Sequence, residues 1–324
     1  MPLPEYFELE GGDRMPRIGF GTWQASDEVL EKAVDAALAA GYRHIDSARA
    51  YENEAALGRA LRRWINGDPA RRKELFVVTK LPPGGNRPDL VEEYFSASLK
   101  DLGLDYIDLY LLHTPFAFEH VPGDMHPKNP DGSMRFDHST DLVGVWKSIL
   151  KLKESGRVRH IGVSNLNEEQ ITRLSAVAKP ACLQIECHAL CQQKSMLAFT
   201  KRHSIPVVAY SPLGSKALAD SLAAKTGREY PSLLELPVVK QIAEARARTP
   251  AQVLLRHLLQ LGVAAIPKST DPTRIKQNIS VWDFELNDKE MAELSALDRG
   301  EDGRICDFSF FVGAEKHPEF PFKK

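Results

Sequence analysis

The sequence is poor in cysteine and has no long hydrophobic run. Four cysteines in 324 residues are too few for a disulfide scaffold, which indicates a reducing compartment, and we expect the cytoplasm. No apolar run approaches the ~18 residues that a membrane-spanning helix needs. Residues 1–10 are polar and acidic and contain no apolar stretch of the kind found in signal peptides. We therefore expect neither secretion nor a membrane partner.

The chain also lacks an excess of charge of one sign. Lysine and arginine number 42, aspartate and glutamate number 44, and the formal net charge is −2. Acidic and basic residues are interspersed, so no basic face is predicted that would attract a polyanion. Nucleic acid is therefore not an expected partner, and a small molecule is the better expectation.

No metal site is predicted. The segment 182–191 contains His188 and the cysteines Cys182, Cys187 and Cys191. Their spacing matches no common structural zinc site. Cys182 and Cys187 also fall in a strand-like run, where cysteine usually packs as a small apolar group.

Two common nucleotide-binding signatures are missing. The segment 19–21 is too short for the G-x-G-x-x-G turn of a Rossmann domain. Lys268 and Ser269 resemble the end of a P-loop, but the glycines that should precede them are absent. The sequence therefore indicates neither of these folds.

What the sequence does contain is a regular alternation of strand-like and helical segments. The strand-like runs end near Trp23, Asp46, Lys80, His113, Ser164, Glu186, Tyr210 and Pro267. After a first helical pattern that stops at Gly41, others lie at about 53–65, 88–102, 139–155, 167–178, 192–203, 237–261 and from 271 onward. Several strands are apolar on both faces, as in a sheet covered on both sides. Eight such units predict an α/β fold, a closed (β/α)8 TIM barrel, with an open doubly wound sheet as the alternative.

Three additions complete the expected architecture. Residues 6–18 predict an N-terminal β-hairpin that covers one end of the fold. The longest irregular stretches are 114–138, 211–236 and 298–324. Each follows a strand end or closes the chain, so we expect these long loops over the C-terminal face of the barrel. We expect residues 1–324 to form a single domain.

Ionisable residues gather at the expected strand ends, which carry the chemistry in such barrels. Asp46, Lys80 and His113 each end a different strand, and Tyr51 lies on the loop beyond Asp46. A free phenol titrates near ~10, and the Lys80 ammonium would stabilise the phenolate of Tyr51. Asp46 would neutralise that ammonium, and His113 would donate a hydrogen bond to a substrate carbonyl. Tyr51 would then be the general acid in a reduction. Taken alone, a salt-bridged aspartate and a core tyrosine are the ordinary interpretations.

Several separated motifs, in one order along the chain, resemble the aldo-keto reductase family. The stretch 41–54 is similar to the signature around the catalytic tyrosine of that family. Further matching segments are 164–165, 184–188, 210–215 and 266–269. The resemblance implies that Asp46, Tyr51, Lys80 and His113 form a catalytic tetrad and that NADPH/NADP+ is the cofactor.

The resemblance also implies a set of cofactor-binding residues. Tyr210 would stack on the nicotinamide, and its carboxamide would bind to Ser164, Asn165 and Gln184. The loop that wraps the pyrophosphate would contain Ser211, Leu213 and Ser215. The adenosine-phosphate site maps onto Lys268, Ser269, Thr270, Arg274, Gln277 and Asn278. The expected set is completed by Thr22, Trp23 and Asp46.

The charges of the last segment favour NADPH over NADH. Lys268 and Arg274 lie at the start of an expected helix, where backbone N–H groups and the helix dipole favour anions. Two cations beside hydroxyl groups suit a 2′-phosphate. From these residues alone, solvated surface charges are the alternative interpretation.

The expected substrate-binding residues are Trp23, Tyr51, His113, Cys306 and Phe308. Pro82 and Thr114 occupy positions that are aromatic in well-known members of the family, so the resemblance implies a wider or differently shaped pocket. The tail segment 304–311 is rich in phenylalanine, which favours an apolar carbonyl substrate. Aromatic residues that merely cap the core are the alternative.

The predicted function is NADPH-dependent reduction of an aldehyde or ketone to the alcohol, of the alcohol dehydrogenase (NADP+) type, by a monomer. Two other classes stay open. A protein of the same fold could bind NADP(H) without turnover, although a complete tetrad counts against this. A cofactor-independent barrel isomerase or lyase would need no NADPH.

Overall fold

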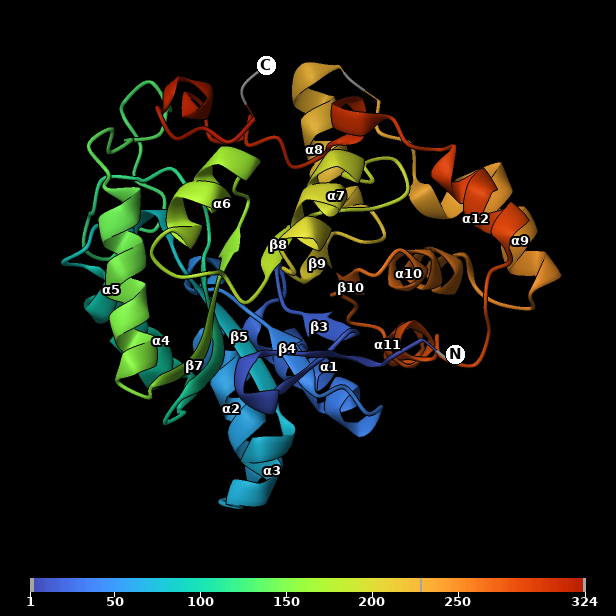
Figure 1. Ribbon diagram of the computed structural model, residues 1–324, viewed down its shortest axis with the longest axis horizontal. Coiled ribbons are helices and arrows are strands. Elements are labelled where there is room, and N and C mark those ends of the chain that lie inside the picture. The colour runs from blue at the N-terminus through green and yellow to red at the C-terminus, as the bar shows by residue number, and fades with distance from the viewer. Residues whose placement is uncertain (1–2, 228, 323–324) are drawn as a thin grey trace.

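The fold is a barrel of parallel strands surrounded by helices (Figure 1). The structure is a computed structural model that describes residues 3–227 and 229–322. The eight strands follow one another in chain order around the sheet. They are β3 (Gly19–Gly21), β4 (His44–Asp46), β5 (Phe76–Leu81), β6 (Ile107–Leu112), β7 (Val158–Ser164), β8 (Leu183–Glu186), β9 (Val207–Tyr210) and β10 (Ala264–Ala265). The predicted strand ends are confirmed.

The helices of the described chain alternate with these strands or lie in the segments between them. They are α1 (Asp27–Ala39), α2 (Glu54–Ile65), α3 (Pro69–Glu74), α4 (Val91–Leu102), α5 (Leu142–Glu154), α6 (Glu168–Ser175), α7 (Lys194–Arg202), α8 (Lys216–Thr226), α9 (Pro237–Ala245), α10 (Pro250–Gln260), α11 (Pro272–Ile279) and α12 (Asp288–Ser295). None of them, within residues 3–227 and 229–322, combines the length and the apolar character needed to cross a bilayer.

The barrel closes between its first and last strands. Ile18 and Ala265 form a parallel bridge at this seam. The N–H of Ala265 donates to the carbonyl of Arg17 at 2.8 Å, and the N–H of Gly21 donates to the carbonyl of Pro267 at 3.1 Å. Because both edges are paired, the sheet has no open edge here, and the (β/α)8 prediction is confirmed over the doubly wound alternative.

The predicted N-terminal hairpin is present and covers the end of the barrel at which the strands begin. Its strands are β1 (Tyr6–Glu8) and β2 (Arg14–Pro16), with Tyr6 opposite Pro16. Met15 is fully buried and packs in one cluster with Phe76, the first residue of β5. The opposite end, where the strands finish, is left for the long loops.

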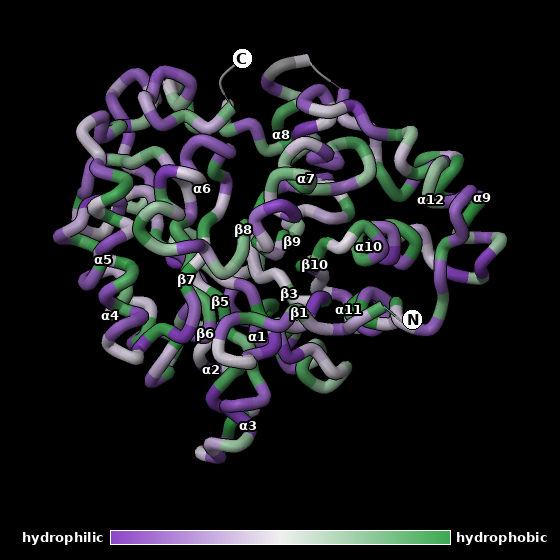
Figure 2. The backbone as a smooth tube through the Cα atoms, viewed as in Figure 1, coloured by the Kyte–Doolittle hydropathy of each residue, from purple (hydrophilic) through white to green (hydrophobic). Residues whose placement is uncertain are grey.

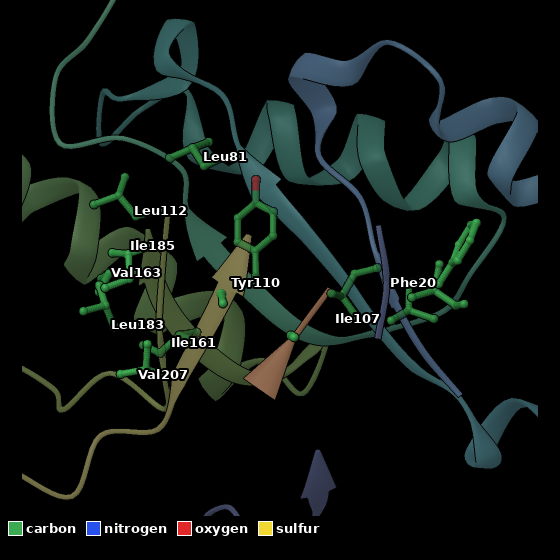
Figure 3. Close-up of a cluster of buried hydrophobic side chains, with 14 of the residues drawn as sticks. Phe20, Leu81, Ile107, Tyr110, Leu112, Ile161, Val163, Leu183, Ile185 and Val207 are labelled. Atoms are coloured by element: carbon green, nitrogen blue, oxygen red, sulfur yellow. The ribbon is translucent and has the colours of Figure 1, made fainter. Parts of the chain in front are cut away.

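The main core lies between the strands and the helices. Figure 2 shows hydrophobic stretches along the strands and a mixture of hydrophobic and hydrophilic residues along the surrounding helices. Figure 3 shows Ile161, Leu183 and Val207, from three successive strands, in one buried cluster. Cys182 and Cys187 are buried free thiols, as expected for cysteines that pack as apolar groups.

Two details of the sequence prediction were wrong. Residues 211–236, expected to be irregular, contain helix α8, which buries Leu218 and Leu222 and ends at Gly227 with a φ of 70°. The single helix expected at 237–261 is two helices, because Thr249 and Gln252 form a capping box that begins α10 anew. Both signals, a C-terminal glycine and a T-x-x-Q cap, were present in the sequence.

We expect Gly58→Ala to destabilise the fold. A Cβ atom at Gly58 of α2 would lie 2.3 Å from the carbonyl oxygen of Asp101 and 2.7 Å from that of Leu102, at the end of α4. Backbone atoms cannot rotate away, so the clash should cost about 1–3 kcal/mol, although alanine is the better helix former by about 1 kcal/mol. Urea unfolding measures the change. Gly84→Ala, whose Cβ would meet only the Tyr94 ring at 3.2 Å or more, is the control. A Gly58→Ala variant as stable as this control would contradict the close approach.

Candidate active site

The fold brings Asp46, Tyr51, Lys80 and His113 together at the C-terminal end of the barrel. The Lys80 ammonium donates to Asp46 Oδ1 at 2.6 Å and to the Ser47 carbonyl at 2.7 Å. It also lies 3.4 Å from the hydroxyl of Tyr51. The rings of Tyr51 and His113 meet edge to face, with centroids 5.8 Å apart. Four residues that are distant in the sequence thus form one contiguous group.

The position of Tyr51 is set by the turn that follows β4. Tyr51 ends a short 3-10 helix (Arg49–Tyr51), and Glu52 then adopts a left-handed φ of 56°. Glu54, the first residue of α2, is buried and accepts hydrogen bonds from Thr79 at 2.6 Å and Ser98 at 2.9 Å. The loop that carries Tyr51 is therefore tied to the neighbour of Lys80 in β5 and to α4.

Opposing effects act on the pKa of Tyr51. Burial raises the pKa of Tyr51 above its ordinary value; the Lys80 ammonium acts in the opposite direction but does not overcome burial, and Asp46 adds to the rise. The effect of Lys80 has the expected direction, since the ammonium lowers the pKa of Tyr51, but in the protein alone desolvation outweighs it. The resting side chain is a neutral phenol that can donate a proton.

Lys80 and His113 take opposite charge states. Burial opposes the charge on Lys80, but Asp46 and Tyr51 together hold the pKa of Lys80 above its ordinary value. Burial, reinforced by Lys80, holds the pKa of His113 well below its ordinary value. Lys80 is thus an ammonium and His113 a neutral imidazole at physiological pH, so His113 can donate only one N–H.

Amide side chains from later strands complete this group. Gln184 Nε2 donates to Asp46 Oδ2 at 2.7 Å. Asn165 Nδ2 donates to the carbonyl of His113 at 2.9 Å, and the Tyr210 hydroxyl donates to Asn165 Oδ1 at 2.8 Å. Each Asp46 carboxylate oxygen therefore has its own donor, and Tyr210 is linked to the tetrad through Asn165.

A cavity of about 520 Å³ opens beside the tetrad and extends to Lys268. It is lined by most of the residues expected to bind cofactor or substrate: Thr22, Trp23, Asp46, Tyr51, His113, Asn165, Gln184, Tyr210, Ser211, Leu213, Ser215, Lys268, Cys306 and Phe308. The three long loops contribute to its wall, as their positions after strand ends predicted. At the far end Lys268 Nζ donates to the carbonyl of Gln24 at 3.2 Å.

Six residues of the expected cofactor set do not line this cavity: Ser164, Ser269, Thr270, Arg274, Gln277 and Asn278. Ser164 is buried behind Asn165, whose Nδ2 donates to its hydroxyl at 3.0 Å. Arg274 is exposed in the first turn of α11, where its N–H donates to the capping carboxylate of Asp271 at 2.8 Å. Gln277 lines a separate shallow depression, and Asn278 is buried. The structure therefore places these side chains behind or beside the cavity rather than in its wall.

Further residues line the cavity, and some of them were not anticipated. Thr114 lines it, and Phe310 and Phe311 line it from the tail segment 304–311, as the resemblance implied. Pro83, rather than Pro82, and His126 of the loop 114–138 were not anticipated. The length of that loop signalled a function but gave no indication of which side chain would face the cavity.

The C-terminal tail is fastened to the barrel by a buried carboxylate. Glu186, at the end of β8, is fully buried and accepts from the N–H groups of Ile305 at 2.9 Å and Cys306 at 2.8 Å. His188 Nε2 lies 2.9 Å from the same carboxylate. Figure 1 shows the tail crossing the end of the barrel beside the loop 114–138, where Phe308 and Phe116 share one cluster. The sequence marked the Gln184–His188 segment but not this role of Glu186.

We expect Asp46→Asn to destabilise the protein strongly and a second change, Lys80→Met, to restore part of the loss. The single variant leaves a fully buried ammonium without its counter-ion, which costs roughly 3–5 kcal/mol, whereas removing both charges removes that penalty. Urea unfolding of both single variants and the double variant gives the coupling free energy. Additive losses in the double variant would contradict a tightly coupled pair.

Comparison with known proteins gives consistent matches over most of the chain. A model of the Aldo/keto reductase family matches residues 17–299. The chain is 43% identical over 299 residues to aldo-keto reductase family 1 member A1 of Gallus gallus, covering 91% of this chain and 89% of that protein. The Mus musculus protein of the same name is 44% identical over 294 residues, 90% of this chain and 88% of its own. The structure of an aldose reductase from Schistosoma japonicum matches with a TM-score of 0.88 at 36% identity and covers 99% of both chains.

These matches confirm the resemblance found in the sequence motifs. They agree with the barrel fold, and they support carbonyl reduction by an oxidoreductase. The chain belongs to the aldo/keto reductase family.

Proposed function

We propose that this protein is an NADPH-dependent reductase that converts an aldehyde or ketone to the alcohol, with Tyr51 as the general acid. The observation that carries the proposal is the contact of the Lys80 ammonium with both Asp46 and Tyr51 beside a cavity that extends to Lys268. This arrangement supports a proton donor and a long, phosphate-bearing cofactor in one cleft.

The residues along the cavity fit an NADP(H) molecule. Tyr210 offers a flat ring near the tetrad, and Asn165 and Gln184 offer amide groups for a carboxamide. Ser211 and Ser215 offer hydroxyl groups midway, and Lys268 offers a cation for the 2′-phosphate, with Arg274 exposed nearby on α11. When bound, NADPH supplies the hydride that the carbonyl carbon accepts.

The side chains of the tetrad supply the proton and orient the carbonyl. The neutral His113 donates an N–H to the carbonyl oxygen and holds it near Tyr51. Tyr51 transfers its hydroxyl proton to that oxygen as negative charge develops there. The phenolate that remains is stabilised by the Lys80 ammonium, 3.4 Å away, which stays charged because Asp46 is bound to it.

A non-catalytic NADP(H)-binding protein is the alternative, and a cofactor-independent isomerase or lyase is a more distant one. The complete tetrad favours the reductase, because a binding protein needs no proton donor beside its cofactor. Loss of NADPH absorbance with a panel of short aldehydes, sugars, quinones and ketosteroids distinguishes reductase from binding protein. NADPH fluorescence titration tests the third class.

We also propose that residues 1–324 act as one domain, as a monomer in the cytoplasm. The packing of the hairpin into one end of the barrel and of the tail across the other supports a single unit. Sedimentation at micromolar concentration tests the monomer.

We predict that Tyr51→Phe lowers kcat by roughly 10²–10⁴-fold while NADPH binding is retained, because only the transferable proton is removed. Steady-state kinetics and fluorescence titration measure the two quantities. Tyr106→Phe, a tyrosine that packs on Arg72 and does not line the cavity, is the matched control and should keep wild-type turnover. Near-normal reduction by Tyr51→Phe would remove the phenol from the mechanism.

We predict that Lys268→Ala weakens NADPH binding by about tenfold or more and changes NADH binding little, because NADH has no 2′-phosphate. Dissociation constants for both cofactors give the ratio. Lys276→Ala, an exposed lysine of the following helix α11 that lies outside the cavity, is the control and should change neither constant. Equal losses for NADPH and NADH would refute the assignment of Lys268 to the 2′-phosphate.

A further inference from the structure

The wall of the cavity contains a histidine that the reduction itself does not use. His126 lines the cavity together with Phe308, Phe310 and Phe311. Its ring stacks on Phe311 with centroids 5.8 Å apart and planes at 26°. A second ring, that of Phe118, has its centroid 6.3 Å away. His126 is therefore a polar side chain set into an aromatic surface.

The backbone of this histidine is fixed, but its ring nitrogens are free to bind. Asp124 Oδ1 accepts from the backbone N–H of His126 at 2.8 Å, which holds the turn. Among residues 3–227 and 229–322, neither ring nitrogen of His126 has a hydrogen-bond partner, and the side chain is half-buried. A neutral imidazole in this position offers one donor and one acceptor to a molecule in the cavity.

The charges around His126 favour this neutral form. Burial lowers the pKa of His126 below its ordinary value, Glu52 and Asp124 act in the opposite direction, and Lys128 adds to the decrease. His113 lines the same cavity, and a charge on His126 would lower the pKa of His113. A cation on His126 is thus disfavoured at neutral pH.

In the described part of the chain, no lysine or arginine lines the cavity outside the proposed cofactor region. The lining includes two lysines, both in that region, and, among the described residues, no arginine. Lys268 lies at the far end, and Lys216 follows the loop 211–215 and pairs with Asp220 at 2.7 Å. A carboxylate on the substrate would be desolvated against the aromatic wall without a counter-ion, which is unfavourable.

We propose that His126 determines specificity: it selects uncharged aromatic or alicyclic carbonyl compounds that carry a second polar group able to hydrogen-bond with its imidazole. This inference rests on the proposed reductase function and adds the class of substrate. The aromatic wall binds the carbon skeleton, and His126 binds the group remote from the carbonyl.

The test compares kcat/KM for matched aldehydes with NADPH. The substrates are benzaldehyde with a 4-methyl, 4-hydroxymethyl or 4-carboxyl group, and biphenyl-4-carbaldehyde with the same three groups at the 4′ position, so that two distances are sampled. Ratios between substrates are taken within each variant, because any common loss of activity then cancels. The variants are His126→Phe, His126→Gln and His126→Arg, with His138→Phe, an exposed histidine of the same loop, as control.

We expect the wild type and the control to prefer the hydroxymethyl over the methyl compound by about fivefold on at least one scaffold, mainly through KM. His126→Phe should abolish this preference, and His126→Gln should retain part of it. His126→Arg should raise the carboxyl-to-methyl ratio about tenfold or more by supplying the missing cation. In the wild type that ratio should also rise as the pH falls from 8 to 5.5, because the imidazole gains a proton, whereas His126→Phe should not show this change.

The two proposals fail in different ways. If the wild type reduces none of the six aldehydes, the reductase proposal itself is contradicted for this class of substrate. If the wild type reduces them but the hydroxymethyl-to-methyl and carboxyl-to-methyl ratios of His126→Phe and His126→Arg equal those of the wild type, the reductase stands and the role of His126 is refuted.

Discussion

The ion pair between Lys80 and Asp46 is the constraint on which the rest of the site depends. The Lys80 side chain is 0% exposed and that of Asp46 is 2% exposed, so both charges have left water. Burying two such ions costs several kcal/mol each unless every donor and acceptor is paired. Here the pairing is complete: the carboxylate receives Lys80 and Gln184, and the ammonium reaches Asp46, Ser47 and Tyr51. Asp46, Lys80 and Gln184 come from β4, β5 and β8, so the pair fixes three strands of the barrel relative to one another.

The same pair influences the ionisation of Tyr51, the proposed proton donor. Desolvation alone would hold the phenol of Tyr51 firmly neutral, and the ammonium lowers the cost of its ionisation without making it ionised at rest. A general acid must hold its proton until charge develops on the substrate, and then release it to leave a stabilised anion. Burial provides the first property and Lys80 the second. His113 is kept neutral by its burial and by the same ammonium, so it can serve as a hydrogen-bond donor without competing as an acid.

The sequence predicted the barrel and the meeting of the four tetrad residues at its rim, because both depend on local pattern. Strand ends follow from apolar runs, and a barrel brings all strand ends to one rim, so Asp46, Lys80 and His113 could be placed together without a structure. The features that were missed depend on tertiary packing. Helix α8 gains its stability from Leu218 and Leu222 packing with Ile305, 83 positions or more along the chain, and the role of Glu186 exists only because the tail returns to it. The position of His126 along the loop 114–138 does not tell whether its side chain faces the cavity or lies on the outside of the loop.

The chemistry and the substrate wall are supported by different parts of the molecule. The tetrad is fixed by strands of the barrel and by the buried ion pair, whereas the wall consists of the loop 114–138 and the tail, which pack mainly on each other. Phe116 lies 5.0 Å from Phe308, and Phe118 lies 5.0 Å from Phe311, ring centroid to centroid. Glu186 joins this pair of segments to the barrel through backbone N–H groups, so the anchor does not depend on which side chains the tail carries. The proposed substrate-wall residues, such as His126 and Phe311, can therefore change while the ion pair and the proposed proton donor Tyr51 stay as they are.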